Sequence, residues 1–130
     1  MLRKILVGGF IAVAALVGST GTGHAGPRVD LGIHFAFPPR LAPVHASPVF
    51  YAPSVRANFF SYNREFFVFR SGVWYVGPGH NGPWAVLPLR HVPRPILAVP
   101  VRYYHARPGE WAHWHHEAPP RWAPTWGHRW

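Results

Sequence analysis

Apolar and aromatic residues cluster between turn residues in one stretch of the chain, residues 64–100. Inside this stretch, residues 65–70 carry four consecutive apolar side chains, namely Phe66, Phe67, Val68 and Phe69. Strands that are buried on both faces show such continuous runs, whereas strands with one exposed face alternate apolar and polar residues. We therefore predict a strand at residues 65–70 that needs cover on both faces.

Ser71 and Gly72 follow this strand as a two-residue turn. A loop of that length sets the register of a hairpin, because pairing continues outward from the turn. The predicted cross-strand pairs are Arg70 with Val73, Phe69 with Trp74, Val68 with Tyr75, and Phe67 with Val76. Aromatic side chains therefore meet across the two strands.

A second reversal is predicted at residues 77–83, because Asn81 and Gly82 tolerate a positive φ. Residues 84–87 can then return as a third strand. The expected fold class is mainly β: a small antiparallel three-stranded meander with long proline-rich irregular arms and one short C-terminal helix. Residues 88–100 contain four prolines, which break any long helix, so we expect a turn of helix or an extended segment laid over the sheet.

The part of the chain that is expected to fold is one aromatic β unit, residues 59–104. Trp74 and Trp84 are interpreted as core residues of this unit. Units of fewer than about 70 residues seldom gain more than about 3–5 kcal/mol without a disulfide, a metal or a partner. The chain has no cysteine, so a disulfide cannot contribute.

Residues 26–58 are predicted to form a proline-rich extended arm. Their proline density favours polyproline II structure over helix, as in a spacer or a ligand for an aromatic groove. The arm and its junction with the β unit also carry more aromatic residues than a spacer needs, so parts of it can pack on the meander or on another surface. These residues are Phe35, Phe37, Phe50, Tyr51, Phe59 and Phe60.

Residues 105–130 form a second arm that is rich in histidine, tryptophan and arginine. Prolines bracket residues 110–118, where a helix of nine residues is possible, although a helix this short is marginal alone in water. In that helix, Trp111, Trp114 and Ala118 would share one face. Glu110, His113, His116 and Glu117 would share another.

The first residues read as a secretory signal peptide, residues 1–25. A basic start is followed by a 13-residue apolar run and by the small-residue site Gly23-His24-Ala25. The apolar run is short for a transmembrane helix, although an uncleaved N-terminal anchor is the alternative. We expect cleavage after Ala25 and export to the periplasm or outer envelope of a Gram-negative bacterium.

Removal of residues 1–25 leaves 11 arginines and four carboxylate residues, hence a net charge of +7 with neutral histidines. Nine histidines remain, and their protonation would raise the charge to +16. Histidine titrates between pH 5 and 8, so the surface should become more cationic as the pH falls. The charge would suit nucleic acid, but export argues against that partner.

Catalytic motifs are absent from the sequence. It contains no Gly-x-Ser-x-Gly elbow, no phosphate-binding glycine loop and no cysteine nucleophile. Glu110 and Glu117 are the only closely spaced carboxylates of the exported chain, and they lie in an arm that would hold them poorly. We therefore expect a non-enzymatic protein without a cofactor.

Two binding hypotheses remain. In the first, arginine and tryptophan form a surface for an anionic envelope polymer or a membrane, because guanidinium pairs with phosphate and carboxylate while indole suits wet boundaries. Its residues are Arg121, Trp122, Trp126, Arg129 and Trp130. In the second, a divalent transition metal such as Zn²⁺, Ni²⁺ or Cu²⁺ binds neutral imidazoles. Its ligands would be His113, His115, His116 and Glu117, with His128 as a further donor.

The order of aromatic and turn residues resembles a group of small Trp/Tyr-rich secreted proteins of proteobacteria. The shared pattern is Gly72-Val73-Trp74-Tyr75, then Gly82-Pro83-Trp84, then Leu87-Pro88, then a Val/Pro-rich segment that ends at Tyr103-Tyr104. The resemblance covers about 45 of the 130 residues. The resemblance implies an envelope protein with a small aromatic β unit, in a structural or adaptor-like role. Another envelope protein is then a further possible partner.

Overall fold

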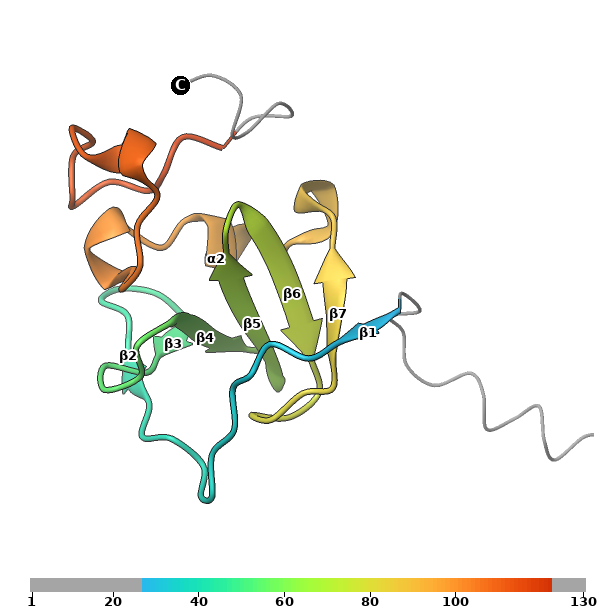
Figure 1. Ribbon diagram of the computed structural model, residues 1–130. Helices are drawn as coiled ribbons and strands as arrows, with labels where there is room; N and C mark the ends of the chain where they lie inside the picture. The colour runs from blue at the N-terminus through green and yellow to red at the C-terminus, as the bar shows by residue number, and fades with distance from the viewer. Residues whose placement is uncertain (1–26, 123–130) are drawn as a thin grey trace, which may run out of the picture.

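The computed structural model describes residues 27–122, in which seven strands form one antiparallel sheet (Figure 1). The strands lie in the order β1-β7-β6-β5-β4-β3-β2. They are β1 (Arg28–Val29), β2 (Ala42–Pro43), β3 (Phe50–Tyr51), β4 (Asn58–Tyr62), β5 (Glu65–Arg70), β6 (Val73–Gly77) and β7 (Trp84–Leu87). The prediction of a mainly β fold is confirmed.

The central hairpin has the register that its turn predicts. Phe69 pairs with Trp74 and Phe67 with Val76. Ser71 and Gly72 have φ values of 51° and 79°, which suits the two-residue hairpin turn that matches strand twist. The predicted third strand also forms, as β7, and pairs with β6.

The prediction of only three strands is wrong, because the sheet continues on both sides of them. β4 pairs with β5 over five residues, and it is followed outward by β3 and β2. On the opposite side β1 pairs with β7. The outer strands β1, β2 and β3 have two residues each, which is too short for a period-two pattern to identify in the sequence.

The segment predicted as an extended arm therefore takes part in the sheet. β1 lies at one edge and β2 at the other, so residues 30–41 must cross from edge to edge (Figure 1). We call residues 30–41 the strap. Leu31 is buried, and Ile33, Phe35 and Leu41 pack against the same cluster of buried residues.

The strands bury both of their faces, as the run at residues 66–69 predicts. On the first face, Phe67, Phe69 and Trp74 pack with residues that follow β7. That cover consists of short turns: η2 (Leu89–His91), α2 (Arg94–Leu97), η3 (Val101–Tyr103) and η4 (Gly109–Trp111). On the second face, Val68, Phe59 and Trp84 lie beneath the strap. Trp74 and Trp84 are both buried, which confirms their interpretation as core residues.

The C-terminal segment does not contain the predicted nine-residue helix. One 3-10 turn, η4, occupies its start, and the chain then bends so that both Trp111 and Trp114 are buried. The backbone amides of Val101 and Arg102 donate to the carbonyls of Ala118 and His116, at 3.0 and 2.9 Å. These long-range bonds join residues 116–118 to η3, whereas a helix of nine residues is marginal on its own.

Candidate functional site

The described tryptophans of the C-terminal segment belong to the core or pack against it. Trp111 stacks on Phe69 and on Trp114, with ring centroids 5.7 and 5.2 Å apart. Trp122 is half-buried, and its indole N–H donates to the carbonyl of Leu97 at 2.9 Å. The buried indoles of Trp111 and Trp114 stabilise the fold and are not available to an external ligand.

The predicted arginine and tryptophan surface is thus divided. Arg121 is exposed, and its guanidinium lies 5.2 Å from the centroid of the Trp114 ring, a cation–π contact. Trp122 faces the core, as described above. The other three residues of the predicted surface, Trp126, Arg129 and Trp130, lie outside the described residues.

The candidate metal ligands are exposed but do not converge. Glu117 accepts a hydrogen bond from Nε of Arg102 at 2.9 Å, and its backbone N–H donates to Nδ1 of His115 at 3.1 Å. His113 and His116 are exposed nearby in the chain. Within residues 27–122 no group of three or more histidine or carboxylate side chains is placed to hold a metal ion. His128, the further donor, lies outside the described residues.

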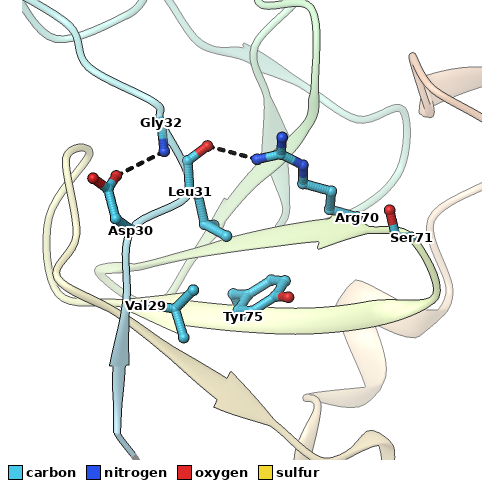
Figure 2. Close-up of a pocket in the computed structure, with 7 residues that line it drawn as sticks. All are labelled: Val29, Asp30, Leu31, Gly32, Arg70, Ser71 and Tyr75. Carbon is cyan, nitrogen blue, oxygen red and sulfur yellow. Dashed lines mark hydrogen bonds between the residues drawn. The ribbon is translucent and has the colours of Figure 1, made fainter.

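A hollow of about 470 Å³ opens beside the β5–β6 turn, where the strap meets the sheet (Figure 2). Nη1 of Arg70 donates to the carbonyl of Leu31, and the Asp30 carboxylate accepts from the amide of Gly32 at 2.8 Å. The His34 imidazole lies 3.8 Å from the same carboxylate. The Arg70–Leu31 bond joins the strap to β5, and the other two contacts lie within the strap.

The same hollow lacks the groups of a hydrolase. Among its lining residues, one carboxylate (Asp30) and two hydroxyls (Ser71 and Tyr75) are accompanied by no histidine. A general acid–base pair, or a serine activated by a base, is therefore not assembled there. The hollow can nevertheless bind a ligand through polar contacts, such as those of the Arg70 guanidinium and of backbone groups.

Two asparagines organise this region in ways that the sequence did not reveal. Asn58, 2% exposed, donates from Nδ2 to the carbonyls of Phe69 and Ala106 at 2.9 and 2.8 Å. Its Oδ1 accepts from the amide of Ala106 at 2.8 Å. Asn81, predicted only as a turn residue, binds both the amide and the carbonyl of Phe35, at 2.8 and 3.0 Å. Asn58 is the first residue of the aromatic strand β4, where a buried polar side chain needs hydrogen-bond partners.

Tyr104 is the described residue whose titration the fold clearly changes. Its side chain is 1% exposed, and desolvation by burial raises its pKa well above the usual value. The hydroxyl has no hydrogen-bond partner among the described residues. Tyr104 therefore remains neutral at physiological pH and acts as part of the core.

Comparisons with protein-family models, with curated proteins and with solved structures found no match for this chain. The resemblance to Trp/Tyr-rich secreted proteins accordingly rests on its motif alone. The helices of the described part are all shorter and less apolar than a membrane-crossing helix has to be.

Proposed function

We propose that this is an exported, non-enzymatic protein of the bacterial envelope whose arginine-rich surface holds anionic envelope polymers. The observation that carries the proposal is the exposure of every arginine between residues 27 and 122. These ten are Arg28, Arg40, Arg56, Arg64, Arg70, Arg90, Arg94, Arg102, Arg107 and Arg121.

Few of these charges are neutralised by the protein. Between described residues, Arg102 and Glu117 form the one arginine–carboxylate pair, with 2.9 Å between Nε and Oε1. Guanidinium groups bind phosphate and carboxylate in a planar, bidentate geometry, which suits the anionic groups of envelope polymers. The exposed arginines are therefore available for external anions.

The arginines are also spread over the whole molecule. Arg28 lies in edge strand β1, Arg64 in the β4–β5 turn and Arg94 in α2. Separate weak contacts to one long polymer add up to a much stronger attachment than any single contact provides. Such a distribution fits a repeating anionic chain better than one small ligand. Export is supported by the signal-like residues 1–25.

Binding of the purified protein to lipopolysaccharide tests the proposal, with an uncharged polysaccharide as the control. Binding should weaken as the Debye length falls from about 30 Å at 0.01 M salt to about 8 Å at 0.15 M. Equal binding to the charged and uncharged polymers, or binding that ignores salt, would contradict the proposal. Specific capture of one envelope protein would instead indicate an adaptor.

A further inference from the structure

A second hollow, of about 340 Å³, lies where the strap meets the ends of β4 and β5. Leu31, Ile33 and Val68 provide apolar walls, and Arg56 and Arg70 provide charge. Protein pockets for small ligands measure about 300–1,000 Å³ and combine apolar walls with a few polar groups. We call this space the arginine hollow.

The arginine hollow differs in charge from two of the other hollows. The hollow of Figure 2 contains Asp30 beside Arg70, and a third, beyond the β5–β6 turn, contains Glu110 beside Arg107. The arginine hollow is lined by two arginines and by no carboxylate. A fourth hollow also has two arginines and no carboxylate in its lining, but one of them, Arg102, is already paired with Glu117. A site with two cations and no internal anion favours an external anion.

One of the two guanidinium groups is held in place. Nη1 of Arg70 donates to the carbonyl of Leu31 at 2.5 Å, which orients the group (Figure 2). Within residues 27–122 that contact is the one hydrogen bond of this guanidinium, so Nε–H and the Nη2 amino group remain as donors there. Arg56 makes no hydrogen bond or ion pair within residues 27–122, so its donors remain as well.

Asn58 makes the wall of the hollow rigid. Its three hydrogen bonds join β4 to Phe69 of β5 and to Ala106. Asn58, Phe69 and Ala106 all belong to the lining of the arginine hollow. A site that is already ordered loses less conformational entropy when a ligand binds.

We propose that the arginine hollow binds one small oxyanion-bearing unit, a carboxylate or phosphate group on a compact and partly apolar body. The volume fits a ligand of about one sugar unit, with its anionic group between Arg56 and Arg70 and its less polar side against Leu31 and Val68. The inference rests on the proposed function, because it names one specific contact within the broader binding of anionic polymers.

Calorimetric titration of the purified protein with glucuronate, glycerol 3-phosphate and glucose tests the site. One anion or both should bind one-to-one, and neutral glucose should not. Arg56→Gln should weaken anion binding about tenfold or more, since hydrogen bonds between charged groups are about twice as strong as neutral ones. Arg90→Gln is the matched control, because Arg90 is equally exposed and lies in η2, outside this hollow. Arg70→Gln should also weaken binding, and thermal melting shows whether its strap contact was needed for folding.

Comparison of the two anions separates the sources of the ligand chemistry. Tighter binding of glucuronate indicates acidic polysaccharide, and tighter binding of glycerol 3-phosphate indicates phosphate groups. Absence of binding for both anions, or equal losses in Arg56→Gln and Arg90→Gln, would overturn the site. If the protein still bound lipopolysaccharide in a salt-dependent manner, the proposed function would stand without this site. If that binding were absent as well, both proposals would fail.

Discussion

The two faces of the sheet are covered in different ways. The first face lies under residues 88–122, where rings stack on one another and Trp111 is 0% exposed. The second face lies under the strap, an extended segment whose Phe35 is only half-buried. Side chains of Asn81 and Arg70 hold the strap by its backbone. One face is thus stabilised mainly by aromatic burial. The cover of the other combines a few apolar side chains of the strap with a few polar contacts to its backbone.

The face that contributes most to stability is therefore not the face that carries the candidate binding site. Burial of large aromatic side chains gives several kcal/mol per residue, whereas a hydrogen bond contributes about 0.5–1.5 kcal/mol net. The hollow of Figure 2 and the arginine hollow are both bordered by the strap, on the weakly held side. Regions of low local stability are where binding segments are commonly found. The aromatic cover of the first face therefore stabilises the fold, and the strap on the second face borders the candidate site.

Trp111→Ala should have the largest effect, because it removes the centre of the aromatic layer. The expected loss is about 3–5 kcal/mol, a large part of the 5–15 kcal/mol that stabilises a typical domain. Chemical denaturation monitored by circular dichroism measures it. Phe37→Ala is the control: Phe37 is 79% exposed, and its replacement should change the stability by less than about 0.5 kcal/mol. Equal stabilities for the two variants would mean that Trp111 lies at the surface.

Asn81→Ala should release the strap without unfolding the sheet. Two hydrogen bonds to Phe35 are lost, at an expected cost of about 1–2 kcal/mol. Hydrogen exchange should accelerate at residues 33–36 and remain unchanged at residues 101–104, under the aromatic layer. Asn81→Asp keeps the acceptor for the Phe35 amide, so its exchange rates at residues 33–36 should lie between those of the wild type and those of Asn81→Ala. If exchange accelerated equally in both regions, the two covers would unfold as one unit.

Tyr104→Phe should have the smallest effect at neutral pH. The hydroxyl has no partner among the described residues, so its loss should leave the stability at pH 7 unchanged or slightly raised. Because burial raises the pKa of Tyr104, the folded state keeps this proton after the unfolded state has lost it. The stability of the wild type should therefore fall above about pH 10, by at most about 1.4 kcal/mol per pH unit from this group.

Denaturation curves between pH 8 and 11 measure the alkaline effect. The fall in stability above pH 10 should be smaller in Tyr104→Phe than in the wild type. Identical pH profiles would show that Tyr104 is accessible to solvent in the folded protein. The stacked layer around it would then be looser than its burial indicates.

The sequence alone determined the central hairpin and its neighbouring strand. Ser71 and Gly72 allow the positive φ values of a tight turn, and the pairs from Phe69–Trp74 outward follow from that turn. The run at residues 66–69 required cover on both faces, which the structure provides. These features are local, because turn chemistry and a continuous apolar run act over a few neighbouring residues.

Only the tertiary structure decided what the two proline-rich arms do. Proline restricts φ and removes a donor, but it does not specify the surface on which an extended segment docks. β1, β2 and β3 have two residues each and exist because longer strands offer them partners. The tryptophans at 111 and 122 look equally suited to a surface or a core until β5 brings Phe69 beside them.

The candidate site depends on tertiary structure even more strongly. Arg56 and Arg70 are 14 positions apart, and neither lies in a recognisable motif. Their common hollow forms because β4 and β5 pair, Asn58 ties Ala106 to both strands, and the strap supplies Leu31 from a distant part of the chain. Composition determined that the surface would be rich in arginine. Long-range packing decided which arginines share one hollow, because that outcome depends on contacts between segments far apart in sequence.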